Sequence, residues 1–141
     1  MTPDQKALVK KTWNVVRPTA DAAASLFYQR LFEIDPSTKN LFHTDISEQK
    51  RKLIQALTYV VDSLDRPERL MPVIEELGRR HANYGVVAPQ YDSVGSALLW
   101  ALEHGLQADW TPAVRTAWLS AYQFVSRIMR DAANSRNSPA L

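Results

Sequence analysis

His81 ends a row of apolar residues at helical spacing and is the first residue whose type and position suggest chemistry. The row is Leu70, Val73, Ile74 and Leu77, and the next position on that face is the imidazole. A buried neutral histidine needs a partner for each ring nitrogen, and a metal on one nitrogen with an acceptor on the other satisfies both. A histidine hydrogen-bonded inside the core is the alternative. Taken alone, His81 favours this alternative, because no other His or carboxylate lies three or four residues away to complete a protein-only metal site.

Tyr28 and Gln49 are polar side chains on two other predicted segments. Each also has a structural explanation: Tyr28 can pack in an apolar helix with its hydroxyl on any acceptor, and Gln49 can be a surface residue of a first helical turn. Phe42 and Leu53 could equally be ordinary core residues. Gln49 and Leu53 share one helical face, because they are four residues apart. No single residue distinguishes a functional site from ordinary core packing, so the distinction depends on how these residues are spaced together.

The segments that must position these residues are predicted to be helices. Three of them begin with a capping residue followed by proline, at Thr2-Pro3, Asp35-Pro36 and Thr111-Pro112. Apolar residues recur at intervals of three and four, and alternating strand patterns are hard to find. The predicted helices cover residues 3–17, 20–33, 36–42, 47–63, 67–82, 89–107 and 112–134. Their unequal lengths without a heptad register favour a globular bundle with oblique crossings.

The composition is typical of one compact domain. The chain has 141 residues, of which 45% are hydrophobic and only four are glycine. We assign residues 1–134 to a single domain and residues 135–141 to a C-terminal tail. The chain contains no cysteine, which excludes disulfides, thiolate metal sites and cysteine nucleophiles.

The charge balance argues against nucleic-acid and membrane partners. Seventeen Lys and Arg against fifteen Asp and Glu give a net charge of +2, and the densest basic run, residues 50–52, adjoins Glu48 as on a solvated helix face. The longest apolar run, residues 97–102, is far shorter than a membrane span. The N-terminus also lacks an apolar stretch. We therefore expect a cytoplasmic protein that binds neither nucleic acid nor membranes.

The segment around His81 resembles the proximal segment of a globin; residues 79–86 read RRHANYGV. Residues 35–42, DPSTKNLF, resemble the short C helix of that family, which begins with proline and ends in a phenylalanine that stacks on haem. Phe42 stands at that position. The resemblance implies an all-α globin fold, with about seven helices wrapped around a haem pocket.

The distal side of the family's haem pocket has matching residues as well. Residues 27–32, FYQRLF, resemble the B helix of single-domain bacterial globins and flavohaemoglobins, with Tyr28 at the position of their distal tyrosine. Gln49 and Leu53 are similar in type and spacing to the distal pair of the E helix. Gln49 and His81 are 32 residues apart, which is the separation that places distal and proximal groups on opposite sides of the haem in this family.

The resemblance covers residues 3–130 and is closest to single-domain bacterial haemoglobins of the flavohaemoglobin type, with some likeness to neuroglobin. It implies a non-covalently bound haem b whose iron is held by His81. It also implies that the cofactor-binding residues are His81, Phe42, Tyr91 and His43, and that the residues on the ligand side are Tyr28, Gln49 and Leu53. His43 could bind a haem propionate or become an internal sixth ligand, or it could be a plain surface histidine.

The resemblance implies tight binding of O2, because a phenol and an amide in a dry pocket stabilise the negative charge that O2 acquires. NO and CO are further ligands, with sulfide and nitrite as candidates, and the protein is expected to be a monomer or weak dimer. The alternative is a nitric oxide dioxygenase, which would need a separate reductase because residues 1–141 contain no flavin or nicotinamide domain. A haem-based gas sensor that acts through a partner is a third candidate.

One feature departs from the family pattern. The family pairs the proximal histidine with a tyrosine and with a glutamate late in the last helix. Tyr91 is present, but residues 132–135 read AANS, and only Asp131 is close. Loss of the carboxylate makes the imidazole a weaker electron donor to iron, which argues against peroxidase-like chemistry and favours ligand binding.

Overall fold

The computed structural model describes residues 1–42 and 45–137, and this part of the chain is helical without strands. Its six α-helices are α1 (Pro3–Val16), α2 (Ala20–Ile34), α3 (Ile46–Asp62), α4 (Pro67–Asn83), α5 (Ala88–Leu106) and α6 (Pro112–Asn137). Three short 3-10 helices lie between them: η1 (Arg17–Thr19), η2 (Pro36–Leu41) and η3 (Gln107–Asp109). Within the described residues, no helix is both long enough and apolar enough to cross a membrane.

The predicted all-α class is confirmed for the described residues, with one difference in the helix count. Residues 36–42 were expected to form a seventh α-helix, but they form the 3-10 helix η2, which ends before Phe42. A segment of six residues offers little room for α-helical hydrogen bonds, so the tighter helix is favoured. At the C-terminal end, α6 continues to Asn137 instead of ending at 134.

Two of the three predicted helix caps are confirmed. Thr2 and Gln5 form a reciprocal capping box at the start of α1, and the Thr111 hydroxyl accepts a hydrogen bond from the Val114 N–H at 3.2 Å. The predicted cap at Asp35 is wrong, because its side chain forms no capping hydrogen bond at the start of η2. Its carboxylate binds hydroxyl groups instead, as described below.

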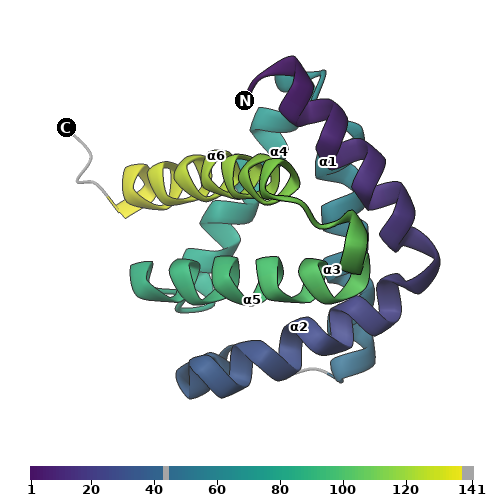
Figure 1. Ribbon diagram of the computed structural model, residues 1–141. Helices are drawn as coiled ribbons and strands as arrows, with labels where there is room; N and C mark the ends of the chain where they lie inside the picture. The colour runs from purple at the N-terminus through teal and green to yellow at the C-terminus, as the bar shows by residue number, and fades with distance from the viewer. Residues whose placement is uncertain (43–44, 138–141) are drawn as a thin grey trace.

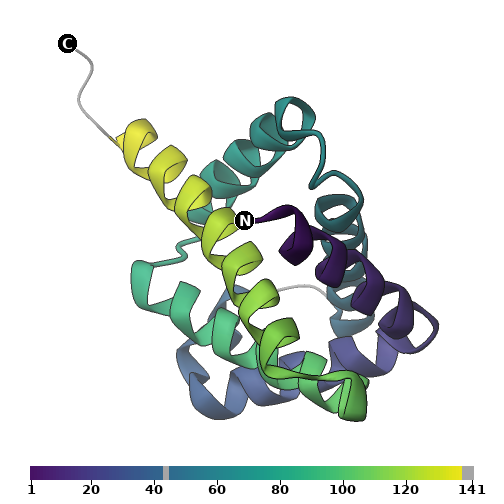
Figure 2. The ribbon, with the colours of Figure 1, turned by 45° about the horizontal axis from the view of Figure 1, so that its top comes forward.

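The helices cross at oblique angles around one core (Figures 1 and 2). α6 packs mainly against α4 and α1, and α2 packs against α5. Trp13 and Trp118 meet edge to face near the centre, with ring centroids 6.2 Å apart. The Trp118 indole N–H donates a hydrogen bond to the buried Thr12 hydroxyl at 2.9 Å, so the polar atom of this large side chain is satisfied inside the core.

α4 and α6 approach each other so closely that their contact includes backbone atoms. A Cβ atom built on Gly78 would lie 2.3 Å from the Met129 carbonyl oxygen and 2.6 Å from the Met129 Cα. Only glycine fits there, because helix backbone cannot move aside as a flexible side chain can. Gly78 lies one helical turn before His81, so this contact fixes the position of the helix that carries the histidine.

We expect Gly78→Ala to lower the free energy of unfolding by about 1–3 kcal/mol or more, as overpacking of a close contact does. Gly105→Ala is the matched control, because its new Cβ would lie 3.8 Å from the nearest Val16 methyl group, an ordinary contact. Alanine there should leave stability unchanged or raise it by up to about 1 kcal/mol. Urea unfolding of both variants tests the expectation, and equal stabilities would contradict the close packing of α4 on α6.

Candidate functional site

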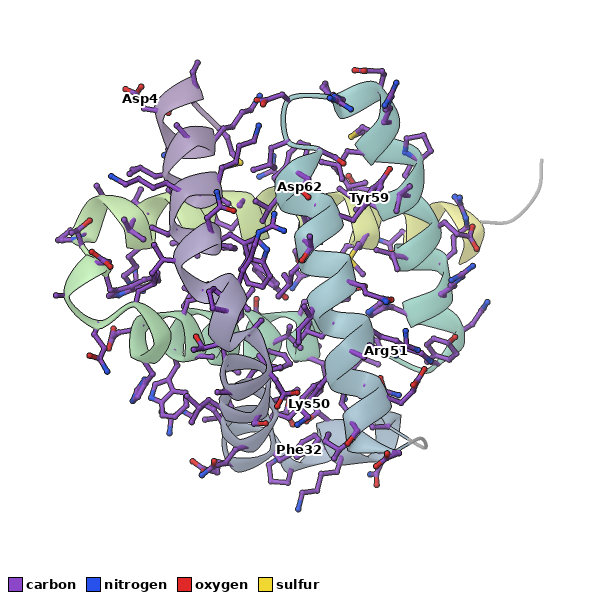
Figure 3. The ribbon with its side chains drawn as sticks, turned by 90° about the vertical axis from the view of Figure 1, so that its right-hand side faces the viewer. Asp4, Phe32, Lys50, Arg51, Tyr59 and Asp62 are labelled. Atoms are coloured by element: carbon purple, nitrogen blue, oxygen red, sulfur yellow. The ribbon has the colours of Figure 1, made fainter. Side chains whose placement is uncertain are left out.

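α3 and α4 run in opposite directions and are joined at one end only (Figure 3). We call the joined end the connected end and the other the open end. The short segment 63–66 joins them, and in Figure 3 Tyr59 and Asp62 mark the connected end while Lys50 and Arg51 mark the open end. α3 packs against α2 and α1 and α4 packs against α6, so the two helices make little contact with each other. Gln49 and His81 both lie roughly four helical turns from the connection, which places both of them towards the open end.

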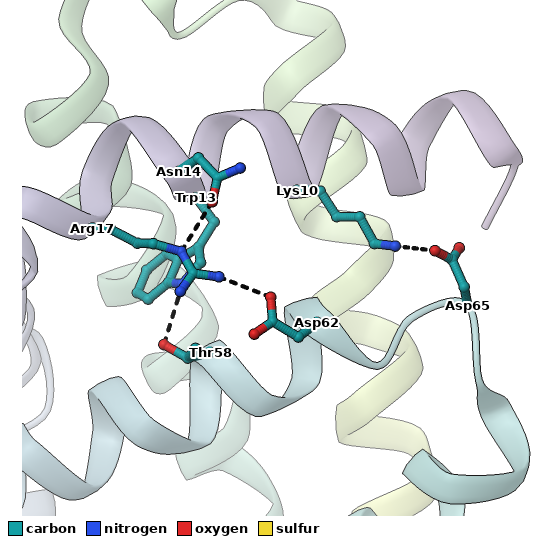
Figure 4. Close-up of polar contacts among 7 residues, drawn as sticks. All are labelled: Lys10, Trp13, Asn14, Arg17, Thr58, Asp62 and Asp65. Carbon is teal, nitrogen blue, oxygen red and sulfur yellow. Dashed lines mark hydrogen bonds and ion pairs between the residues drawn. The ribbon is translucent and has the colours of Figure 1, made fainter.

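Polar contacts from α1 and from Arg17, the first residue of η1, reach the connected end (Figure 4). Lys10 forms an ion pair with Asp65 in the connecting segment, and the Arg17 guanidinium donates a hydrogen bond to Asp62 at 2.8 Å. The Trp13 indole N–H donates to the Thr58 hydroxyl at 3.3 Å. Because the ion pairs are exposed, each adds little to stability. Together these contacts join the C-terminal end of α3 and the segment after it to α1 and Arg17.

His81 has one ring nitrogen with a fixed partner. Its Nδ1 lies 2.6 Å from the Leu77 carbonyl oxygen, and since a carbonyl can only accept, Nδ1 carries the proton. The lone pair is therefore on Nε2. Burial lowers the pKa of His81, and the bond to Leu77 opposes this only in part, so the ring is neutral near pH 7. A neutral imidazole with Nδ1–H on a backbone carbonyl is the usual state of a metal-binding histidine.

The backbone at His81 is fixed by the end of α4. The Val86 N–H donates to the His81 carbonyl at 3.0 Å and the Gly85 N–H donates to the Ala82 carbonyl at 3.1 Å, which together make a Schellman motif. Gly85 has a φ of +90°, a left-handed conformation that glycine adopts without a steric penalty. The helix therefore stops shortly after His81.

The face of α4 that carries His81 leaves apolar surface uncovered. Val73 and Leu77 precede His81 at intervals of four residues on that face; Val73 is 37% exposed and Leu77 is partly exposed. Leu70 and Ile74, on the neighbouring face, are almost fully buried. A row of exposed apolar residues that ends in a neutral imidazole fits a flat apolar cofactor with a metal at its centre.

Tyr28 reaches the open end from α2. It is 5% exposed, and its hydroxyl donates a hydrogen bond to the Gln49 backbone carbonyl on α3 at 3.2 Å. Burial raises the pKa of Tyr28 to about 12. The phenol therefore keeps its proton at neutral pH and can act as a hydrogen-bond donor.

An aromatic cluster surrounds the Tyr28 ring. Phe42 lies edge-on to Tyr28 with ring centroids 5.3 Å apart, and Phe32 lies 5.8 Å from Phe42 and 6.0 Å from Tyr28. Leu53 packs against the same core from α3, where it lines a small apolar cavity with Phe27. The structure thus brings the predicted residues Tyr28, Gln49, Phe42 and Leu53 to one region, although their roles stay predictions. His43 lies outside the described residues.

Tyr91 lies in the first turns of α5 and is 8% exposed. Its carbonyl accepts a hydrogen bond from the Tyr122 hydroxyl, and burial raises the pKa of its own hydroxyl. Among the described residues, the His81 ring is hydrogen-bonded to the Leu77 carbonyl, so a direct pair of His81 with Tyr91 stays a prediction.

Arg130 is a neighbour of Tyr91 that sequence analysis missed. Its guanidinium carbon lies 4.9 Å from the centroid of the Tyr91 ring, and it donates hydrogen bonds to the Ala88 carbonyl at 3.1 Å and to Asp92 at 3.3 Å. Nothing in the sequence around Arg130 indicates which residue its guanidinium contacts. A cation therefore stacks on this tyrosine, in a region where the sequence offers no glutamate.

Comparison with known proteins identifies the family. The model of the family described as "Globin" matches residues 25–129. The chain belongs to the globin family. A flavohemoprotein of Rhizobium meliloti is 31% identical over 132 residues, which is 92% of this chain and 33% of that protein. A neuroglobin of Tetraodon nigroviridis is 27% identical and aligns with 89% of this chain and 87% of its own length.

A solved structure shares the fold over nearly the whole length of this globin. It is an engineered carbene transferase from a putative nitric oxide dioxygenase of Rhodothermus marinus, with a TM-score of 0.88, 27% identity, and coverage of 97% of this chain and 96% of that one. The flavohemoproteins differ in length, since this chain spans about a third of the one from Rhizobium meliloti. Membership of the globin family implies haem binding, and the donor set at His81 fits that cofactor.

Proposed function

We propose that this globin binds O2 and other diatomic ligands at a non-covalent haem b, with His81 as the single protein ligand and Tyr28 and Gln49 on the opposite side. The observation that carries the proposal is the state of His81: Nδ1 is tied to the Leu77 carbonyl at 2.6 Å, which leaves the Nε2 lone pair for iron. Supporting it, α4 presents uncovered apolar surface beside His81, and the Tyr28 hydroxyl reaches Gln49 on α3.

The haem supplies an iron with one open position for a small ligand when it is bound. Tyr28 donates a hydrogen bond to a ligand that has gained negative charge. To do so its O–H rotates away from the Gln49 carbonyl, a weak partner at 3.2 Å, so the net gain is the difference between the two bonds. Phe42 and Leu53 keep water from this region, which strengthens the bond that Tyr28 makes.

A second candidate, nitric oxide dioxygenase activity, is favoured by the names of the relatives. The matched flavohemoproteins and the putative nitric oxide dioxygenase of Rhodothermus marinus share this fold or sequence. Joining nitric oxide and dioxygen into nitrate consumes one electron per turnover, so a reductase must supply electrons to this chain. Arg130, which stacks on Tyr91, is a cation and would not give a proximal histidine the electron density that a carboxylate would.

The first test is the absorption spectrum of the purified protein in the ferric, ferrous and carbon-monoxide forms. A Soret band that shifts on reduction and again with carbon monoxide supports the proposed site. A protein that takes up no haem on reconstitution contradicts it. A low-spin ferrous spectrum before ligand is added would reveal an internal sixth ligand and contradict the open position.

The enzyme and the ligand binder are distinguished by nitric oxide consumption. We expect the oxygenated protein alone to consume one equivalent of nitric oxide and then stop, because nothing returns the electron that each reaction removes. With a flavin reductase and a nicotinamide donor added, continued consumption that scales with the globin concentration supports dioxygenase activity. Consumption that stops after one equivalent even with the reductase, while reduction of the globin is seen directly, assigns ligand binding instead.

A further inference from the structure

The Asp35 carboxylate joins two segments that lie far apart in the chain. Its Oδ1 accepts a hydrogen bond from the Ser37 hydroxyl in η2 at 2.5 Å, and its Oδ2 accepts one from the Ser93 hydroxyl in α5 at 2.8 Å. These two bonds hold the pKa of the Asp35 carboxyl below its usual range. Asp35 is therefore an ionised acceptor that bridges η2 and the first turns of α5.

The bridge continues into the loop before α5. The buried Gln90 donates a hydrogen bond from its amide nitrogen to the Ser37 hydroxyl at 3.2 Å. The Gln90 amide oxygen accepts the Val87 N–H at 2.9 Å. Within η2 itself, the fully buried Thr38 donates from its hydroxyl to the Asp35 carbonyl at 2.7 Å. Two side-chain hydrogen bonds therefore tie η2 and the residue before it to α5.

η2 leads directly into Phe42, whose ring contacts Tyr28. The ring centroids of Phe42 and Tyr28 lie 5.3 Å apart in an edge-to-face pair, so a shift of η2 changes the space available to the Tyr28 ring. The Tyr28 hydroxyl lies at a long 3.2 Å from its acceptor and is held mainly by the packing of its ring.

We propose that Asp35, through its bonds to Ser93 and Ser37, is a positioning residue for the distal Tyr28: it fixes η2 and Phe42, and thereby holds the Tyr28 hydroxyl where a ligand meets it. The proposal rests on the proposed ligand-binding function. If Asp35 has this role, Ser93, which lies on α5 outside the distal region, affects the rate of ligand dissociation.

Ser93→Ala removes the α5 side of the bridge with a minimal change in volume, and Asp35→Asn removes its charge. We expect each to speed O2 dissociation by about two- to fivefold, the scale of one weakened hydrogen bond. Ser96→Ala is the matched control, since Ser96 lies on the same helix, is exposed and takes no part in the bridge. In a Tyr28→Phe background, Ser93→Ala should have no further effect, because the two changes act through one hydroxyl.

Two further measurements do not depend on the rate of ligand loss. The infrared C–O stretch of the carbon-monoxide form should shift in Ser93→Ala and not in Ser96→Ala, because it reports the polarity beside the ligand. In the haem-free protein, the Thr38 and Phe42 amides, which donate within η2, should exchange faster in Ser93→Ala.

A Ser93→Ala protein with unchanged dissociation and an unchanged C–O stretch, while Tyr28→Phe dissociates faster, overturns the positioning role and leaves the proposed function intact. Equal effects of Ser93→Ala with and without the Tyr28 hydroxyl also overturn it. If Tyr28→Phe itself leaves O2 dissociation unchanged, the distal role in the proposed function fails, and the positioning role fails with it.

Discussion

Replacing His81 with glycine is expected to lower haem affinity by more than about 100-fold, since even the outer partners of a ligating histidine are worth about 10–100-fold. The fold of α4 should persist, because Gly78 still packs on Met129 and Gly85 still ends the helix. Added imidazole should restore haem uptake by filling the space of the missing ring. Haem titration followed by absorbance, with and without imidazole, measures the effect.

His104→Gly is the matched control for this variant. The His104 ring also places Nδ1 against the carbonyl oxygen four residues earlier, that of Trp100 at 2.9 Å, but it lies on the exposed last turn of α5. Both variants carry the same cost of glycine in a helix, about 1 kcal/mol. Full haem retention in His81→Gly, or equal losses in both variants, would remove His81 from the site.

Tyr28→Phe is expected to speed O2 dissociation by roughly tenfold. A hydrogen bond to a charged acceptor is worth about 1.5–3 kcal/mol, and the bond to the Gln49 carbonyl that Tyr28 gives up subtracts part of this. The phenylalanine ring keeps the edge contact with Phe42, so the change removes the hydroxyl and little else. Stopped-flow displacement of O2 by carbon monoxide gives the rate.

Tyr59→Phe provides the control for Tyr28→Phe. Tyr59 lies on α3 at the connected end, is 41% exposed, and donates to the Arg69 carbonyl at 3.5 Å, so its loss should leave dissociation unchanged. The Tyr28 pKa of about 12 adds a second check. The donor is present below that pKa and is lost only as the pH rises toward it, so dissociation should be constant from about pH 6 to about pH 10. Dissociation that accelerates within that range, or a rate equal to that of Tyr59→Phe, contradicts the role of Tyr28.

Helix positions could be predicted from the sequence because local signals decide them. The capping box at Thr2 and the cap at Thr111 each involve residues within one turn, and apolar spacing reports burial directly. Asp35 shows where this fails. Its carboxylate accepts the hydroxyl of Ser37, two residues away, and that of Ser93, 58 residues away, and only the packed fold brings the Ser93 hydroxyl within reach.

The candidate site divides in the same way. Tyr28, Gln49 and Phe42 were predicted to be site residues through a resemblance to a family with a known three-dimensional arrangement, and the structure places these three residues in one region. Arg130 could not be placed, because an arginine on the outer part of a helix is usually solvated. Its contact with Tyr91 depends on how α6 crosses α5, an angle that no short pattern specifies.

The low burial of α3 affects the resistance of the protein to proteases before haem binds. Of the seventeen residues of α3, Val61 alone is almost fully buried, whereas α6 has buried residues along most of its length. The other apolar residues of α3 that pack against the core are only partly buried, so we expect α3 to open at a lower free-energy cost than α6 and to be cleaved by proteases more often. A ligand that binds only the closed form opposes this opening by mass action. The cellular abundance of this globin should therefore follow the supply of haem.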